Sequence, residues 1–311
     1  MISDKLKGGI FVFLGACSFG VLSTIVKTAY SEGYSLEQVT GSQTFFGMSL
    51  LWVVYLIQYL HGKSKSRQKA EDVLPDNRLK YTMWWKVVLA GTFTGLVGIF
   101  YYQCVKLLPA SIAIILLMQY LWISILIEAV VFKKKPHKMQ LIAAAIVLVG
   151  TLFAGGIFNS EVVLNAKGIF FGFLAAFCYS IFILTSGRVG NDLPVFKKSA
   201  LMITGSCMIT WIVFPPLFFF DGVFFDGLYK WGLALAVLGT VIPPLFFSVG
   251  MPRTGVSLGA ILSAAELPVA VTSSRFILHE HVQFLQWLGV ILILSAIMLT
   301  NIKLRNRDQN A

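Results

Sequence analysis

Long apolar runs alternate with short polar or turn-rich segments along the whole 311-residue chain. A helix needs about 20 mostly apolar residues to cross a bilayer. Ten runs come close to or exceed that length, and they are residues 8–28, 36–60, 87–107, 109–132, 139–158, 168–187, 198–220, 231–250, 254–277 and 285–303. The pattern predicts an all-α polytopic membrane protein with ten transmembrane helices, because the bilayer core excludes open sheet edges.

Composition supports the same class. Hydrophobic residues make up 57% of the chain, charged residues make up 13%, and the mean hydropathy is +0.79. A soluble domain carries about a quarter charged residues. The sequence therefore predicts a protein whose surface faces membrane lipid.

The net charge of +11 is explained by the distribution of Lys and Arg between the two sides of the membrane. If the amino terminus is cytoplasmic, most of the Lys and Arg residues lie in cytoplasmic segments, as the positive-inside rule requires. The expected outside segments hold Lys27, Lys106, Lys167 and Lys230. We therefore expect both termini in the cytoplasm of a bacterial cell, a location in its cytoplasmic membrane, and no nucleic-acid partner.

The chain repeats itself. KGGIFVFLGA from Lys7 and KGIFFGFLAA from Lys167 share six of ten positions at an offset of 160. A weaker match places ASIAIIL from Ala110 over VSLGAIL from Val256 at an offset of 146. One duplication explains both offsets if the first copy has a longer loop between its second and third helices.

The duplication predicts two repeats, residues 1–158 and 159–311. Each repeat holds five helices, an odd number, so the second copy enters the membrane from the opposite side. Inverted repeats are typical of secondary transporters, whose substrate site lies near the midplane between the halves. Because the two repeats form a complete unit, we expect a monomer or a weak homo-oligomer.

Several segments resemble a known family. The five-plus-five helices, TGVSLGAILSAAELPVAV from residue 254, the HEH turn from residue 279 and QWLGVILILSAI from residue 286 are similar to the EamA-type branch of the drug/metabolite transporter superfamily. The resemblance covers almost the whole chain. It implies export or exchange of small metabolites such as amino acids, related amines or drugs. Members often carry arginine where this chain has Gln43, so the resemblance does not define the substrate.

Glu266 is the main candidate for function. It lies about 17 Å from either end of the ninth run, at the bilayer centre. A lipid-facing charge there costs about 2.5–3.5 kcal/mol or more, so the side chain faces protein or water, or is protonated. Pro268 removes a backbone hydrogen bond and is expected to free the carbonyl of Ala264. We therefore expect substrate binding or proton coupling at Glu266, with a buried packing role as the alternative.

Other polar residues are expected around the same site. Ser263 shares a helix face with Glu266. At the offset of 146, Tyr120 lies over Glu266, and aromatic groups opposite a carboxylate would suit a cationic organic solute. Ordinary packing is the alternative for these aromatic residues. The remaining candidate site residues are Gln119, Trp122, Gln43, Ser18 and Tyr179.

Three further predictions concern bending and charge. Pro268, Pro243 and Pro244 are candidate hinges, because proline kinks membrane helices. Pro215 and Pro216 are expected in the outer half of the seventh helix. Glu128 lies about one turn from Lys133–Lys135 and is expected to pair there or to extend toward the membrane surface.

Other function classes are less consistent with the sequence. No Walker A motif or intramembrane His–Asp pair is present, so neither ATP-driven transport nor a membrane enzyme is expected. No cofactor and no metal site are predicted. A small-molecule transporter, with protons as a possible second substrate, is the preferred interpretation. A proton-independent facilitator, a lipid or drug transporter, and a non-transport receptor or assembly protein remain alternatives.

Overall fold

The computed structural model describes residues 4–66, 84–108, 110–133, 135–154, 165–277, 279 and 282–309, and all its regular structure is helical. The α-helices are α1 (Asp4–Gly20), α2 (Leu22–Ser31), α3 (Leu36–Ser66), α4 (Trp84–Leu107), α5 (Ala110–Met118), α6 (Tyr120–Val131), α7 (Lys138–Ala154), α8 (Ala166–Arg188), α9 (Val195–Val213), α10 (Tyr229–Leu235), α11 (Ile242–Thr254), α12 (Val256–Ser263), α13 (Glu266–Ile277) and α14 (Phe284–Gln309). A 3-10 turn at Leu217–Phe219 and π-helical segments at Phe224–Leu228 and Ala236–Val241 complete the list.

The helices account for all ten apolar runs. Among the described residues, seven helical stretches are long and apolar enough to cross a membrane: Asp4–Ser31, Leu36–His61, Trp84–Leu107, Ile112–Val131, Ala166–Arg188, Phe224–Thr254 and Val256–Ile277. Lys138–Ala154 and Phe284–Met298 are shorter apolar helices. The prediction of an all-α polytopic membrane protein is therefore confirmed, while the full set of ten spans stays a prediction.

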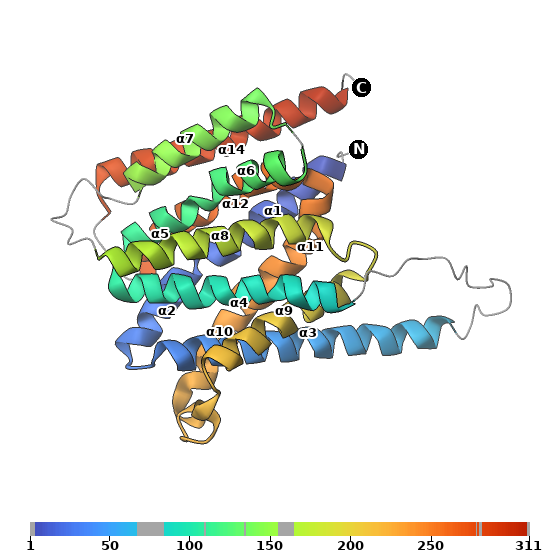
Figure 1. Ribbon diagram of the computed structural model, residues 1–311, viewed down its shortest axis with the longest axis vertical. Coiled ribbons are helices and arrows are strands. Elements are labelled where there is room, and N and C mark those ends of the chain that lie inside the picture. The colour runs from blue at the N-terminus through green and yellow to red at the C-terminus, as the bar shows by residue number, and fades with distance from the viewer. Residues whose placement is uncertain are drawn as a thin grey trace.

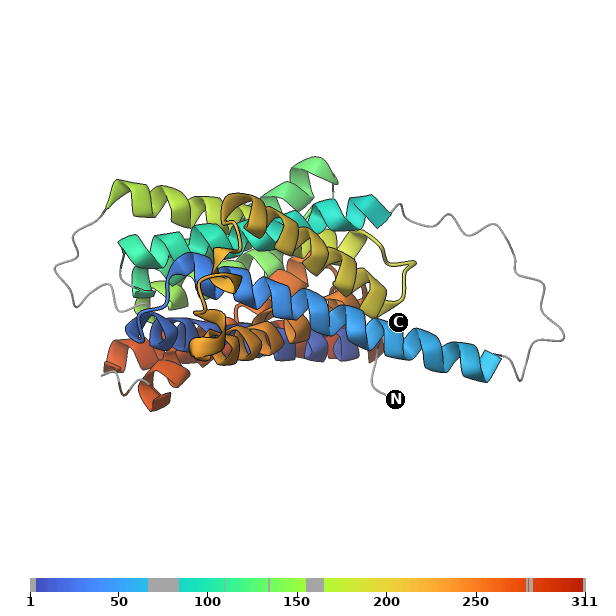
Figure 2. The same cartoon turned by 90° about the horizontal axis from the view of Figure 1, so that it is seen from below.

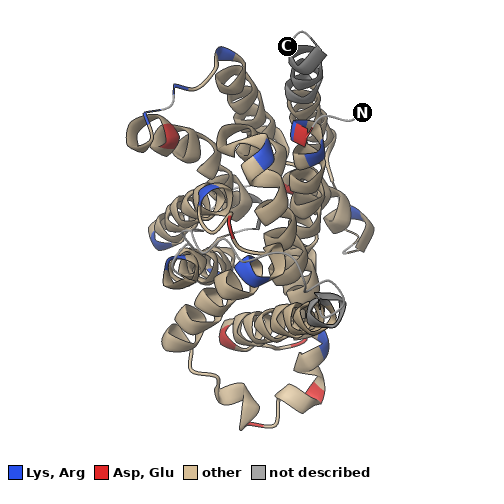
Figure 3. Ribbon diagram, turned by 90° about the vertical axis from the view of Figure 1, so that its right-hand side faces the viewer, with Lys and Arg blue, Asp and Glu red and all other residues tan. Residues whose placement is uncertain are grey.

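The helices form one bundle in which the two ends of the chain lie together (Figures 1 and 2). The start of α1, the later part of α14, the end of α3 and the start of α4 all lie at this end, which we call the terminal end. Figure 3 looks onto the terminal end and shows Lys and Arg on several of its helices. The face of the membrane on which this end lies stays a prediction.

Two spans are broken at corresponding positions. The helix pairs α5–α6 and α12–α13 begin at Ala110 and Val256, restart at Tyr120 and Glu266, and end at Val131 and Ile277. The offset is 146 at each of these points. At both breaks the backbone tightens to i→i−3 hydrogen bonds, from Gln119 N to Leu116 O and from Ala264 N to Ile261 O, each 3.2 Å long. Such short tight turns commonly mark functional positions within helices.

Pro268 acts differently from our expectation. It is the third residue of α13, in the first turn, where a missing backbone N–H leaves few bonds unmade. The carbonyl of Ala264 is not free, because it accepts a hydrogen bond from Leu267 N at 3.2 Å. The break therefore places the carboxyl of Glu266 at the start of α13, but it leaves the backbone carbonyl of Ala264 hydrogen-bonded.

The paired prolines mark boundaries of helical segments. Pro243 and Pro244 are among the first residues of α11, directly after the π-helical segment Ala236–Val241. Proline has no backbone N–H to donate, and the wider π-helical turn before these residues accommodates the missing hydrogen bonds. The prediction that Pro215 and Pro216 lie inside the seventh helix is wrong. Helix α9 ends at Val213, and these prolines begin the connection that follows.

Close packing joins the two halves of the chain. A side chain at Gly91 of α4 would collide with the backbone of Met202 on α9, and one at Gly205 of α9 would collide with the backbone of Val88 on α4. Helix α4 also packs along α8, and α11 packs along α1. In the predicted repeat α1 corresponds to α8 and α4 corresponds to α11, so the α4–α8 contact and the α1–α11 contact are equivalent in the two halves.

Candidate functional site

A cavity lies inside the bundle, in the part away from the terminal end. It has a volume of about 110 Å³. Helices α1, α2, α3, α4, α5, α8, α9 and α13 and the π-helical segment Ala236–Val241 contribute to its wall. Its polar lining residues are Ser23, Thr40, Gln43, Thr44, Thr94, Tyr101, Tyr102, Tyr179, Ser206, Thr240 and Glu266.

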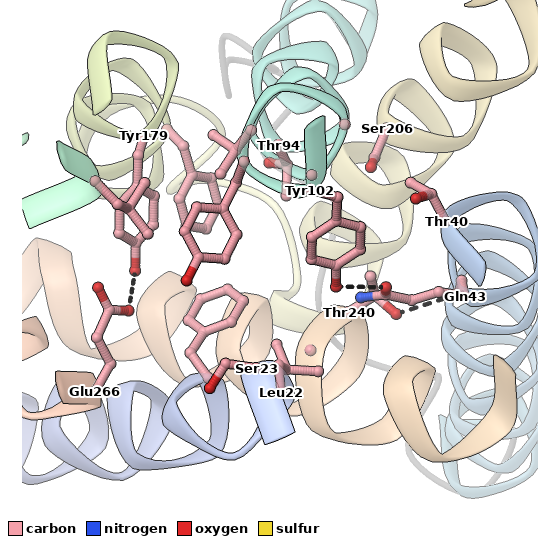
Figure 4. A pocket seen from close by; sticks show the side chains of 18 of the residues that line it. Leu22, Ser23, Thr40, Gln43, Thr94, Tyr102, Tyr179, Ser206, Thr240 and Glu266 are labelled. Atoms are coloured by element: carbon pink, nitrogen blue, oxygen red, sulfur yellow. Dashed lines mark hydrogen bonds between the residues drawn. The ribbon is translucent and has the colours of Figure 1, made fainter. Parts of the chain in front are cut away.

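Glu266 is held at one side of this cavity by the break between α12 and α13. Glu266 is 5% exposed. Its Oε2 accepts a hydrogen bond from the Tyr179 hydroxyl at 3.1 Å, and the two side chains face each other in Figure 4. Its Oε1 is buried and has no hydrogen-bond partner. Helix α1 fits closely behind it, because a side chain at Gly20 would collide with the Glu266 carbonyl.

Aromatic rings surround the carboxyl. The Tyr179 ring meets Phe19 edge-on at 6.1 Å and stacks with Phe182 at 5.8 Å between ring centres. Tyr120 packs against Tyr179 at 4.6 Å from outside the cavity wall. The Tyr120 hydroxyl is anchored to the Ser263 hydroxyl at 2.9 Å. Tyr179 is therefore fixed on several sides, and its hydroxyl fixes the carboxyl of Glu266.

The opposite side of the cavity is polar and uncharged. The Tyr102 hydroxyl donates to Gln43 Oε1 at 3.2 Å, as Figure 4 shows. Thr240 donates to the carbonyl of Ala236 at 2.8 Å. The buried hydroxyls of Thr40 and Thr94 have no hydrogen-bond partner. Buried polar atoms are normally paired, so these hydroxyls and Glu266 Oε1 are available to a bound molecule or water.

The charge balance of the lining is one-sided. Glu266 carries the sole carboxyl of the described residues that line the cavity, and this set contains no Lys, Arg or His. Phenylalanine, leucine and isoleucine side chains supply much of the remaining wall. Small-molecule sites are typically such apolar cavities with a few placed polar groups.

The structure separates the predicted site residues into three groups. Glu266, Gln43 and Tyr179 line the cavity, while Tyr120 and Ser263 lie behind its wall and bond to each other. Ser18 donates to the carbonyl of Leu238 at 2.6 Å and is not part of the lining.

Gln119 and Trp122 lie away from the cavity. Trp122 Nε1 donates to Gln119 Oε1 at 2.9 Å, and Trp122 is 42% exposed. Their expected place at the site is therefore corrected. The reason is the turn at Gln119, which changes the direction that successive side chains take on α5 and α6.

Sequence reasoning missed several hydroxyl residues of the lining, namely Thr40, Thr44, Thr94, Ser206 and Thr240. A signal was present on the fourth α-helix, where Thr94, Gly98 and Tyr101 recur at i, i+4 and i+7 and thus share one face. Threonine and serine occur throughout membrane helices, however, and no such spacing singles out the others.

A second buried carboxyl lies toward the terminal end. Glu128 of α6 is 1% exposed, and Arg188 Nη2 of α8 lies 2.7 Å from its Oε1. Ser257 of α12 donates to its Oε2. The Arg188 guanidinium also covers the Phe132 ring at 3.8 Å. Two partners of Glu128, an arginine and a serine, thus belong to the second half of the chain.

Comparison with known proteins identifies the family. The model of the EamA-like transporter family matches residues 6–156 and 166–302. The chain belongs to the EamA-like transporter family. The protein is therefore a multi-pass protein of the bacterial cytoplasmic membrane, as predicted, and its family consists of transporters rather than enzymes.

Individual relatives of this EamA-like transporter are distant. An uncharacterized transporter, YcbK of Bacillus subtilis, is 23% identical over 93% of this chain and 90% of its own length. The threonine/homoserine exporter RhtA of Salmonella typhimurium is 25% identical over 70% of this chain and 72% of its own length. A solved crystal structure covers 96% of this chain and 99% of its own at a TM-score of 0.70 and 14% identity, which establishes the fold alone.

Proposed function

We propose that this protein is a secondary transporter that exports small organic solutes by alternating access, and that the cavity at Glu266 is its solute-binding site. One observation carries the proposal. A cavity walled by both halves of the chain contains a buried carboxyl with one unpartnered oxygen. A buried, ionisable group in a membrane-spanning segment is expensive, so its presence favours a functional role.

The halves of the chain have the features expected of inverted repeats. The family model matches two segments that meet near the predicted boundary at 158/159. The α5–α6 and α12–α13 pairs share their starts, breaks and ends at one offset. Helices α7 and α14 are preceded by the same local bond, from His137 N to Gln140 Oε1 and from Gln283 N to Gln286 Oε1, again 146 residues apart.

Alternating access requires one end of the bundle to be closed while the site faces the other. In this structure the contacts toward the terminal end are tight, because a side chain at Gly8 would collide with Arg253 and Thr254 of α11. The pair of Glu128 and Arg188 also joins the two halves there. Opening toward the terminal end would have to separate such contacts, so we assign them to the closed inner side of the transporter.

Export of amino-acid-like or related solutes is the form of the proposal that the relatives support, because RhtA is named a threonine/homoserine exporter. A facilitator without a coupling ion and a transporter of drugs or lipids would use the same cavity. A receptor or assembly role predicts no solute flux at all.

The test is an open-ended efflux measurement. Purified protein is reconstituted in liposomes loaded with a metabolite extract rich in amino acids and amines, and mass spectrometry identifies the solutes that leave faster than from protein-free liposomes. We expect selective loss of a few small organic solutes. Folded protein that produces no selective loss contradicts the proposal and favours a receptor role.

A variant that fills the cavity links the flux to the proposed site. Gly98 lines the cavity, and a methyl group there would meet Thr40 at an ordinary contact distance of 3.7 Å. We expect Gly98→Leu to reduce efflux about tenfold or more by occupying the space of the solute. Gly98→Ala is the matched control and should stay within about twofold of the wild type. Equal fluxes in all three proteins would place the transport path elsewhere.

A further inference from the structure

The charges around the cavity restrict what the proposed transporter can bind. Among the described lining residues one carboxyl, Glu266, faces no counter-charge, and its Oε1 has no hydrogen-bond partner. A solute that enters must leave water. An ammonium group recovers its lost hydration at this carboxylate, whereas a carboxylate finds no cation in the same wall.

The surroundings of Glu266 also suit an organic cation. Tyr179 holds Oε2, Oε1 is buried without a hydrogen-bond partner in this residue of the cavity wall, and the rings of Phe19 and Tyr179 meet edge-on in the same wall. Aromatic rings stabilise a nearby ammonium through their negative faces. The carboxylate and the rings therefore form one end of a site for a positively charged group with an apolar body.

The other end of the cavity accepts a neutral polar group. Gln43 and Tyr102 are hydrogen-bonded to each other, and the hydroxyls of Thr40 and Thr94 are unpartnered. Hydroxyls and an amide can donate to or accept from an ester, hydroxyl or amide of a solute. These groups can also solvate a carboxylate, but without a full opposite charge they do so less well than water.

We propose that the cavity selects amphipathic organic amines over the amino acids from which they differ by a carboxylate. This inference rests on the proposed function and narrows its substrate class. It predicts that blocking the carboxylate of an amino acid, as in an ester, improves binding. The single negative charge of Glu266 then sets the selectivity, and the neutral end sets the size and polarity of the rest of the solute.

The test uses four small molecules that each carry a phenyl ring and differ in their amine and carboxylate groups. Phenethylamine, phenylalanine methyl ester, phenylalanine and 3-phenylpropionate are titrated by calorimetry into the purified full-length protein in detergent. We expect the amine and the ester to bind at least about tenfold more tightly than phenylalanine, and 3-phenylpropionate to bind least. Phenylalanine or 3-phenylpropionate binding as tightly as the amine would overturn the inference.

Variants assign the selectivity to the carboxyl. Glu266→Gln should remove the preference for the amine, whereas Glu37→Gln, which makes the same charge change at an exposed position of α3, should keep it. If Glu266→Gln does not yield monodisperse protein, Glu266→Asp replaces it. The shorter side chain keeps the charge, so the amine should bind more weakly but still better than phenylalanine. Selectivity that survives in Glu266→Gln contradicts the inference.

The efflux measurement separates this inference from the proposed function. Selective efflux of carboxylate-bearing solutes, blocked by Gly98→Leu, would preserve the transporter and overturn the amine preference. Absence of both selective efflux and amine binding would overturn both.

Discussion

Two buried carboxyls lie in corresponding spans of this transporter, and their surroundings differ. Glu128, in the α5–α6 pair, meets Arg188 at 2.7 Å and Ser257. Glu266, in the α12–α13 pair, meets the hydroxyl of Tyr179 and keeps one oxygen without a partner. The first carboxyl has a counter-charge within the protein, whereas no described residue forms an ion pair with the second, which a ligand cation or a proton could neutralise.

The difference indicates where binding energy is available. A buried ion pair is largely self-compensated, so it joins helices but has little further attraction to offer. A buried carboxyl without a cation is unfavourable until something neutralises it. The comparison therefore supports the proposal that Glu266 binds the solute, while Glu128 connects the two halves.

Arg188→Met should give the largest effect on stability. It removes the Arg188 guanidinium from the buried Glu128 carboxyl and also removes the contact with Phe132. We expect the free energy of unfolding to fall by about 3 kcal/mol, at the low end for a broken buried pair because Arg188 is partly exposed. Denaturant unfolding in mixed micelles measures it. Lys197→Met at the same end is the control, and equal stabilities of the two variants would show that the pair holds nothing together.

The pH dependence of transport should distinguish the second carboxyl from the first. A permanently charged probe, phenethyl-trimethylammonium, does not titrate itself. As pH falls, protons neutralise Glu266 and the cation loses its partner, so the efflux rate should fall when the pH is lowered from about 8 to about 5.5. The neighbouring Tyr179, Tyr120 and Tyr101 hydroxyls stay protonated over this range.

Glu266→Gln should abolish this pH dependence, because the amide does not titrate there. The measurement is the initial efflux rate at equal pH on both sides of the membrane. Parallel profiles for the wild type and Glu266→Gln would remove Glu266 from the mechanism. Glu37→Gln should follow the wild type.

Tyr179→Phe sharpens the comparison with a smaller change. It keeps the carboxyl but removes the hydroxyl that fixes Oε2. One hydrogen bond of about 1 kcal/mol corresponds to about a fivefold loss of amine affinity. Calorimetric titration with phenethylamine measures it, with Tyr55→Phe, which lies outside the cavity lining, as the control. A loss as large as that of Glu266→Gln would show that the hydroxyl itself binds the solute.

Much of the fold was predictable from sequence, because lipid imposes long apolar runs and the duplication leaves matching residues. The start of each run was less certain where polarity changes gradually. The end of α9 depends on Pro215 and Pro216, whose effect is local and could have been inferred. The π-helical segment before Pro243 could not have been inferred, since the spacing of its apolar residues does not distinguish it from a turn of α-helix.

The site was predictable where a residue is expensive in a membrane. The sequence indicates Glu266 as a candidate for that reason, and in the structure Glu266, Gln43 and Tyr179 line one cavity, while their role stays a prediction. The depth of a residue in the bilayer, however, does not reveal the direction in which its side chain points. Tyr120 and Trp122 are two residues apart on α6 and therefore point to different sides, so that one packs behind the cavity wall and the other is exposed.

Trp122→Phe should therefore have the smallest effect. The substitution removes the hydrogen bond to Gln119 but keeps an aromatic ring at an exposed position outside the cavity lining. We expect amine affinity and efflux to stay within about twofold of the wild type, as is usual for exposed substitutions. A larger loss would mean that the solute path reaches the outer face of α6. In that case the difference between the surroundings of Glu128 and Glu266 would no longer be sufficient to locate the solute.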